Sequence, residues 1–122
     1  MKRILVVDDE KDIRSMLRIP LGRAGYEIEE ASDGAMAIAI HRRRPVHLLV
    51  LDILMPEKEG IETILEFRRD YPGVKIVAIS GGGIVDAGDY LEIAKNSGAD
   101  RIFKKPLDLP LLITAIKELI GS

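Results

Sequence analysis

The chain has no cysteine, and only 4% of its 122 residues are aromatic. Without thiols it cannot form a disulfide framework, a zinc-thiolate site, an iron–sulfur cluster or a cysteine nucleophile. It needs none of these for stability, because a chain of this length buries roughly two-thirds of the surface that its unfolded form exposes. We therefore expect a single domain over residues 1–122.

An excess of charge of one sign and long apolar runs are also lacking. The formal net charge is −2, so nothing attracts the chain as a whole to nucleic acid or to an anionic membrane. Its longest apolar runs fall far short of the roughly 18 residues that a membrane span needs. The run at residues 4–7 is also shorter than the apolar core of a secretory signal, which has at least about seven residues. We expect a cytoplasmic protein that binds neither membranes nor nucleic acid directly.

Short apolar segments alternate with helical patterns along the whole chain. The segments predict strands at residues 4–7, 26–30, 48–51, 74–79 and 101–103, and the patterns predict helices at 10–24, 34–43, 60–69, 86–97 and 108–120. This strict alternation predicts an α/β fold, a doubly wound parallel sheet with helices on both faces. Three glutamates in the second strand place it at an edge. Nothing after residue 120 forms a second domain, so we expect the output to come from a partner.

The helices carry apolar stripes and polar ends. The second helix has Ala35, Ile38 and Ala39 at helical spacing, and the third has Ile61, Ile64 and Leu65. Candidate N-cap residues are Asp33, Asp86 and Asp108. His41 and the arginines at 42–44 close the second helix, where cations complement the helix dipole, so we predict a solvated end. We assign a structural role to His47, which lies beside a strand.

Polar side chains follow four of the five predicted strands. They are Asp8 and Asp9, Asp52, Ser80, and Lys104 with Lys105. Ligands of open parallel sheets bind beyond the carboxyl ends of the strands, so these groups should share one rim. Taken alone, the Asp8–Asp9 pair would more often cap a helix, Ser80 would belong to a turn and Lys105 would be solvated. Their agreement favours a site.

Three clustered carboxylates require compensating charge. At an effective dielectric near 20, each pair would repel by roughly 3 to 4 kcal/mol. Oxygen ligands without histidine or cysteine favour a hard cation, and Mg²⁺ fits a site with few carboxylates. With the charge neutralised, Asp52 can attack phosphorus and carry an acyl phosphate. Lys105 would contribute a compact positive charge and Ser80 a hydroxyl donor.

Five motifs resemble the receiver domain of bacterial two-component response regulators, of the stand-alone, chemotaxis-regulator-like type. They are Val7-Asp8-Asp9-Glu10, Leu51-Asp52-Ile53-Leu54-Met55-Pro56 with Gly60, Ala78-Ile79-Ser80, Gly98-Ala99-Asp100 and Lys105-Pro106-Leu107. The resemblance covers essentially the whole chain. It implies a flavodoxin-like (βα)5 fold, with a five-stranded parallel sheet in the order 2-1-3-4-5.

The resemblance also implies roles for individual residues. Asp8 and Asp9 would hold Mg²⁺, Asp52 would be both phosphoacceptor and metal ligand, Ser80 would be the switch hydroxyl and Lys105 the phosphate-binding lysine. The Leu54 carbonyl would be a further metal ligand, the Gly81 amide would contact the phosphoryl group, and the Lys105–Pro106 bond would be cis.

The implied function is signalling rather than catalysis of a separate reaction. A histidine kinase or phosphotransfer protein would donate a phosphoryl group to Asp52, and the conformational change would control a separate effector protein. The chain would catalyse only its own Mg²⁺-dependent phosphorylation and dephosphorylation, and so would not be an enzyme in the ordinary sense.

One position departs from the family pattern. Three residues before Lys105 the family usually has an aromatic residue or histidine that turns inward on activation, whereas this chain has Ile102. Phe103 cannot replace it, because consecutive strand residues point to opposite faces. We therefore expect activation through Ser80, the glycines at 81–83 and the helix that follows them.

Two rival functions follow from the same residues. The first is a degenerate receiver that binds partners without being phosphorylated, which the departure at Ile102 keeps open. The second is a phosphatase of the haloacid dehalogenase-like class, which also forms an aspartyl phosphate with Mg²⁺. That class needs a second acid two residues after its nucleophile, and Leu54 occupies that place.

Overall fold

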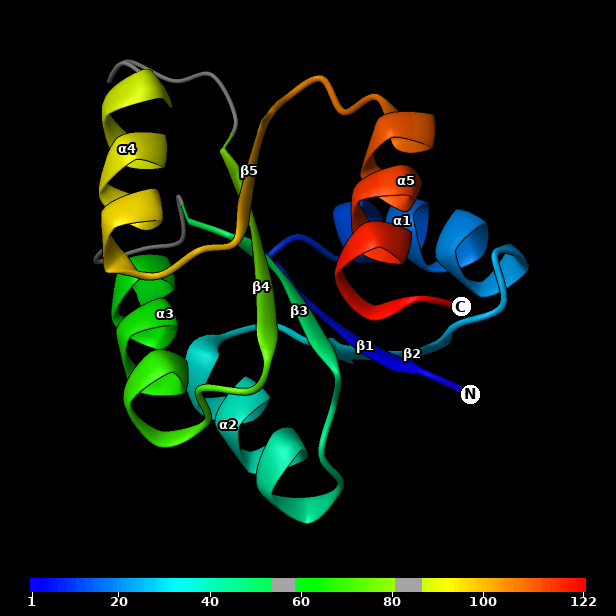
Figure 1. Ribbon diagram of the computed structural model, residues 1–122, viewed down its shortest axis with the longest axis horizontal. Coiled ribbons are helices and arrows are strands. Elements are labelled where there is room, and N and C mark those ends of the chain that lie inside the picture. The colour runs from blue at the N-terminus through cyan, green and yellow to red at the C-terminus, as the bar shows by residue number, and fades with distance from the viewer. Residues whose placement is uncertain (54–58, 81–86) are drawn as a thin grey trace.

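The computed structural model describes residues 1–53, 59–80 and 87–122, without the side chains of 87–91. Strands and helices alternate throughout these residues (Figure 1). The elements are β1 (Arg3–Val7), α1 (Lys11–Arg23), β2 (Glu27–Ala31), α2 (Gly34–Arg43), β3 (Leu48–Asp52), α3 (Glu59–Asp70), β4 (Lys75–Ser80), α4 (Ala87–Ser97), β5 (Arg101–Lys104) and α5 (Leu109–Ile120). Each lies within one or two residues of its predicted range.

All pairings in the sheet are parallel, and the strand order is β2-β1-β3-β4-β5. This order confirms the predicted flavodoxin-like fold. The glutamate-rich β2 lies at an edge, also as predicted. Helices α1 and α5 cover one face of the sheet, and α2, α3 and α4 cover the other (Figure 1). Among the described residues, no helix combines the length and the apolar character that crossing a membrane would require.

The core consists of one apolar cluster on each face of the sheet. Alternate residues of one strand divide between them: Ile4 and Val6 belong to the cluster under α1 and α5, whereas Leu5 and Val7 belong to the one under α2, α3 and α4. Because both faces are covered, a central strand has no solvent side. This explains why the strand sequences are continuously apolar.

Two of the predicted helix caps are present. The carboxylate of Asp33 accepts a hydrogen bond from the Met36 amide at 2.7 Å, and that of Asp108 accepts one from the Leu111 amide at 3.2 Å. Each side chain satisfies an N–H group that the first turn of its helix leaves without a partner. Asp86 lies outside the described residues.

The predicted faces of α2 and α3 are partly wrong. In α2, Ala35 and Ala39 are exposed, while Ala37 and Ile38 are buried. In α3, Leu65 is 51% exposed. The buried face of α3 includes Ile64, as predicted, together with Gly60, Thr63 and Phe67. Small and polar residues on a packed face weaken the apolar periodicity on which the prediction relied.

The predicted solvated end of α2 is wrong for His41. Its side chain is buried, its Nδ1 accepts a hydrogen bond from the Val46 amide at 3.1 Å, and its ring packs edge-on against Phe67 and Tyr71. Burial lowers the pKa of His41, so the ring is held neutral. The arginines at 42–44 are exposed as predicted. The end of α2 packs against the end of α3, a contact that charge at a helix end does not reveal.

Candidate functional site

The acidic residues that were predicted to share a rim do lie together at the carboxyl edge of the sheet. Asp8 directly follows β1 and Asp52 ends β3, which is the neighbouring strand. One carboxylate oxygen from each of Asp8, Asp9 and Asp52 lies within 4.8 Å of the others. The parallel pairing of β1 with β3 therefore creates the cluster, since it brings both strand ends to one place.

Three hydrogen bonds fix the position of Asp8. Its amide donates to the Ala31 carbonyl at 3.1 Å, and its carbonyl accepts from Nη1 of Arg14 at 2.7 Å. Its side-chain Oδ1 accepts from the Glu10 amide at 2.9 Å. These contacts hold a buried carboxylate beside the exposed Asp9. Sequence reasoning missed Arg14, although its position four residues after Glu10, in the first turns of α1, places it near this end of the helix.

Asp52 is held by the end of β3. The amide of the next residue, Ile53, donates to the Ile79 carbonyl of β4 at 3.0 Å. The second residue of α3, Gly60, lies so close that a Cβ atom there would come 2.8 Å from the Asp52 carbonyl oxygen. Such close approach is possible only for glycine. The Asp52 side chain is buried, with 10% of its surface exposed.

A lysine completes the cluster. Nζ of Lys105 lies 3.4 Å from Oδ2 of Asp52 and 4.0 Å from Oδ2 of Asp8. The Lys105 amide donates to the carbonyl of Ser80 at 2.9 Å, which places the loop after β5 beside the end of β4. The Lys105–Pro106 bond is cis, as the resemblance implied. Ser80 is fully buried at the end of β4, whereas Lys104 is exposed.

Among the described residues, three carboxylates lie around one lysine at this edge. The pKa of Asp8 is raised to about 6, first because burial disfavours its charged form. The negative charge of Asp52 and a hydrogen bond with Asp9 raise it further, against the opposing effects of the Glu10 amide and Lys105. A cation bound nearby would favour the charged form of this carboxyl group. The three oxygen ligands therefore fit a hard divalent ion such as Mg²⁺.

Some predicted residues are not part of the described structure. The Leu54 carbonyl, the Gly81 amide and the glycines at 81–83 lie outside the described residues.

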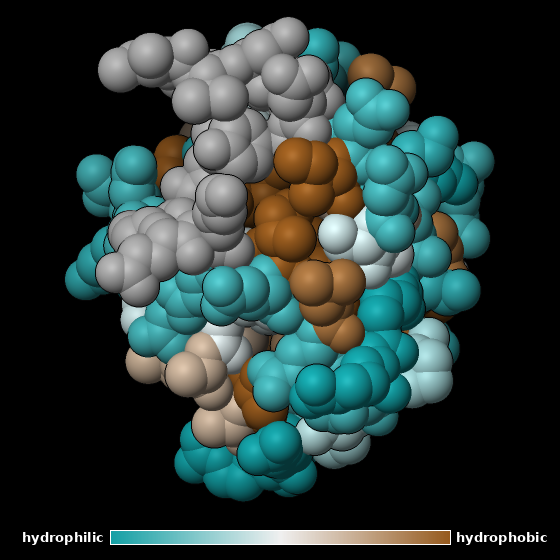
Figure 2. Space-filling view, turned by 90° about the vertical axis from the view of Figure 1, so that its left-hand side faces the viewer, coloured by the Kyte–Doolittle hydropathy of each residue, from teal (hydrophilic) through white to brown (hydrophobic). Residues whose placement is uncertain are grey.

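Ile102 and Phe103 do point to opposite faces: Phe103 packs against the cluster under α1 and α5, while Ile102 is 37% exposed. Figure 2, seen from the side of α3 and α4, shows a strip of apolar side chains across a mainly hydrophilic surface.

Comparison with known proteins agrees with this arrangement. The family model of the response regulator receiver domain matches residues 4–117. The chain belongs to this family. The receiver protein CpdR of Brucella abortus is 32% identical over 98% of both chains. The receiver domain of NtrX from the same organism superposes with a TM-score of 0.88 at 30% identity, again over 98% of both chains.

Other relatives are longer than this receiver domain. The transcriptional regulatory protein CpxR of Klebsiella pneumoniae is 33% identical over 98% of this chain but only 50% of its own length. The chain thus spans about half the length of CpxR and of a similar regulator from Cyanophora paradoxa. The likeness to these proteins concerns the receiver domain alone.

The raised pKa of Asp8 predicts how Mg²⁺ should stabilise this receiver domain. The folded chain keeps the Asp8 proton up to about pH 6, whereas the unfolded chain loses it near its ordinary pKa of 3.8. In metal-free protein, the contribution of Asp8 to the free energy of unfolding is therefore present at low pH and lost as the pH rises through about 6. Mg²⁺ needs the deprotonated carboxylate, so it has the opposite dependence.

We expect Mg²⁺ to raise the unfolding temperature at about pH 7.5 and to lose roughly tenfold in affinity per pH unit below the Asp8 pKa. The measurement is the difference in Tm with and without Mg²⁺ at each pH, which cancels the other titrating groups. An equal Mg²⁺ shift at about pH 5 and pH 7.5 would contradict this prediction.

Proposed function

We propose that this receiver domain accepts a phosphoryl group on Asp52 and uses it to change its affinity for a partner. The observation that carries the proposal is the set of distances around Asp52: two further carboxylates within 4.8 Å and the Lys105 ammonium at 3.4 Å. Membership of the receiver family supports the same assignment.

The proposed chemistry starts at a carboxylate oxygen of Asp52. This oxygen forms a bond to the phosphorus of a phosphohistidine or of a small acyl phosphate. The bond from phosphorus to the donor nitrogen or oxygen breaks, and its electron pair leaves with the donor; a histidine donor then takes a proton from solvent. The product is an aspartyl phosphate.

The residues around Asp52 position and stabilise the transferred group. Asp8, Asp9 and Asp52 would hold Mg²⁺, which supplies positive charge to the phosphoryl oxygens. Lys105 shifts its ammonium from the Asp52 carboxylate to a phosphoryl oxygen, a contact that strengthens as charge develops there. The buried Ser80, one strand away, offers its hydroxyl as a donor. In this proposal the chain takes part as a reactant in its own phosphorylation and does not catalyse a reaction of other molecules.

A partner completes the proposed cycle. The donor would be a histidine kinase or a phosphotransfer protein in the cytoplasm, where ATP is available, and the recipient of the signal would be an effector protein. The phosphoryl group can shift only an equilibrium whose two states it binds differently. Ser80 at the end of β4 and Lys105 in the loop after β5 are described groups able to make that difference.

The deciding experiment is intact-mass spectrometry after incubation with Mg²⁺ and a small acyl phosphate. We expect one phosphoryl group per chain in the wild type and none in Asp52→Asn, which keeps the shape of the side chain but has no nucleophilic carboxylate. A wild type that gains no mass would support the degenerate receiver instead. Continuous release of phosphate without a stable adduct would support the phosphatase.

A further inference from the structure

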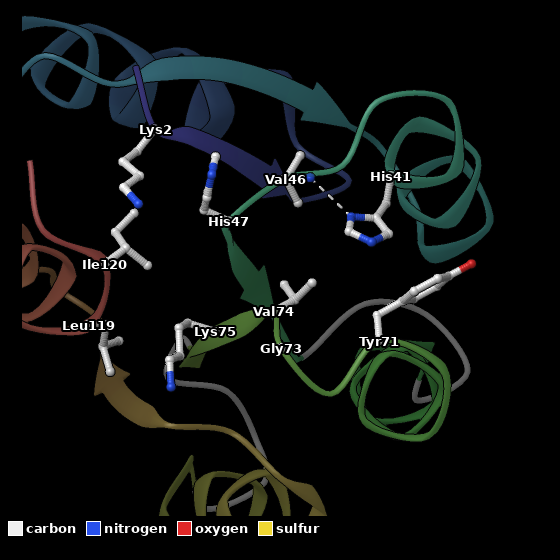
Figure 3. Close-up of a pocket in the computed structure, with 10 residues that line it drawn as sticks. All are labelled: Lys2, His41, Val46, His47, Tyr71, Gly73, Val74, Lys75, Leu119 and Ile120. Carbon is white, nitrogen blue, oxygen red and sulfur yellow. Dashed lines mark hydrogen bonds between the residues drawn. The ribbon is translucent and has the colours of Figure 1, made fainter.

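A cavity lies at the amino ends of the strands, whereas Asp52 lies at their carboxyl ends. It measures about 480 Å³, within the range of small-molecule sites in proteins. Its walls come from segments that precede β1, β3 and β4 and from the last turn of α5 (Figure 3). Because β3 is five residues long, this cavity and the acidic cluster are separated by about 16 Å of strand.

The polar lining of this cavity is basic. Lys2, His47 and Lys75 line it, with His41 at the end near Tyr71 (Figure 3). None of the lining residues that the structure describes is acidic. Both lysines are half-buried, and neither forms an ion pair within the described part of the chain. The acids on neighbouring elements already have partners: Glu27 pairs with Arg3 and Arg44, and Glu118 with Arg101.

The two histidines can only donate into this cavity. Nδ1 of His47 accepts from the Arg3 amide at 3.0 Å, and Nδ1 of His41 accepts from the Val46 amide at 3.1 Å. In each neutral ring the remaining nitrogen, Nε2, therefore carries the proton. Burial, and then the positive charges of Lys2, the N-terminus and Arg3, lower the pKa of His47, so the neutral ring is favoured.

The other walls of the cavity are apolar. Val46 and Val74 are buried behind it, and Leu119 and Ile120 of α5 form one side, with Lys2 extending toward Ile120 (Figure 3). Basic side chains without a carboxylate among them favour an anion, and the apolar walls favour a ligand with an apolar part. Several separate donors suit the oxygens of a phosphate better than the two oxygens of a carboxylate.

We propose that this cavity binds a small phosphate monoester, with its phosphate among Lys2, His47 and Lys75 and its apolar group against Leu119 and Ile120. The proposal is independent of phosphorylation at Asp52, because the two sites share no residue.

The test is an NMR titration of the full chain with phenyl phosphate in EDTA, so that no metal draws the phosphate to the acidic cluster. We expect saturable shifts at the amides of residues 2, 47, 75 and 120. Inorganic phosphate should bind more weakly than phenyl phosphate, and phenol should not bind, because each lacks one half of the recognised ligand.

Charge variants locate the site. We expect Lys2→Gln and Lys75→Gln each to weaken binding about twofold to fivefold, the size of one solvent-accessible charge contact. Lys117→Gln is the matched control, since it removes the same charge from an exposed position of α5 outside the cavity and should leave the affinity unchanged.

Three results would overturn the proposal. The first is the absence of saturable shifts at millimolar phenyl phosphate, and the second is a set of shifts confined to Asp8, Asp52 and Lys105. The third is a loss of affinity in Lys117→Gln as large as in Lys75→Gln, which would mean that net charge alone attracts the anion.

Discussion

Replacing Asp9 by alanine is expected to abolish Mg²⁺-dependent phosphorylation of Asp52 while leaving the fold intact. Asp9 is exposed and contributes nothing to the apolar core, but its carboxylate is one of the three that can hold the ion. Removing a partner in the outer shell of a metal site costs about 10-fold to 100-fold in affinity or activity, and loss of a direct ligand should exceed this. Asp9→Ala also removes a like charge, so the metal-free protein should unfold at an unchanged or higher temperature.

These opposite effects separate a metal role from a structural one. The labelled fraction is followed over time by intact mass at fixed Mg²⁺, and Tm is measured with and without the ion. Asp12→Ala is the control, because Asp12 is an exposed acid of α1 outside the cluster and should leave both readouts nearly unchanged. Labelling that persists in Asp9→Ala, or in wild type with EDTA, would refute the assignment of this site to Mg²⁺.

The strands could be predicted from local sequence, and the acidic cluster from the parallel topology that those strands imply. A central strand that is buried on both faces must be apolar throughout, as residues 48–51 are. Parallel strands also end at a common edge, so the residues that follow them meet there. Asp8 and Asp52 lie side by side for this topological reason, and no long-range packing detail was needed to place them.

The errors arise where packing between elements decides the outcome. His41 ends a helix with three arginines, which favours solvent, yet its ring is enclosed by Phe67 and Tyr71 from α3 and the turn after it. The order of residues along α2 contains no information about what α3 will place beside it. The same limit applies to Arg14, whose contact with the Asp8 carbonyl depends on the path of the chain between β1 and α1.

Some motif residues of the family proved to be structural. The carboxylate of Asp100 accepts from the Ile76 amide at 2.7 Å and pairs with Arg68, which also donates to the carbonyls of Gly98 and Val74. This network ties the end of α3 to the starts of β4 and β5. Asp100 therefore has a structural role and does not belong to the acidic cluster, to which the motifs assigned Asp52.

Gly60 lets α3 pack against the strand end that carries Asp52. We expect its replacement by alanine to destabilise the protein by about 2 to 3 kcal/mol, the upper part of the usual cost of forcing an atom into a packed interior. A Cβ atom at this position would lie 2.5 Å from Cα of Ile53 and 2.8 Å from the Asp52 carbonyl oxygen. Both are main-chain atoms of the strand end, so no side-chain rotation can relieve the clash. Helix α3 must move away from β3, or β3 must move.

The matched control is Gly22→Ala in α1. A Cβ atom there meets nothing within 4 Å, so alanine should stabilise the helix by about 0.5 to 1 kcal/mol through its better helix propensity. For a chain of this size the two variants should differ in Tm by roughly 10 °C or more, in opposite directions from the wild type.

Gly60→Ala should also slow labelling of Asp52 in the fraction that remains folded, because a shift of about 1 Å in a reacting group can cost about a hundredfold in rate. Thermal unfolding gives the stability, and intact mass, measured well below the unfolding transition, gives the rate. If Gly60→Ala were as stable as Gly22→Ala, the prediction would be wrong, because the 2.5 Å approach of the new Cβ atom to Cα of Ile53 would then cost nothing. Lost stability with an unchanged labelling rate would show instead that the strand end keeps its position and that α3 alone gives way.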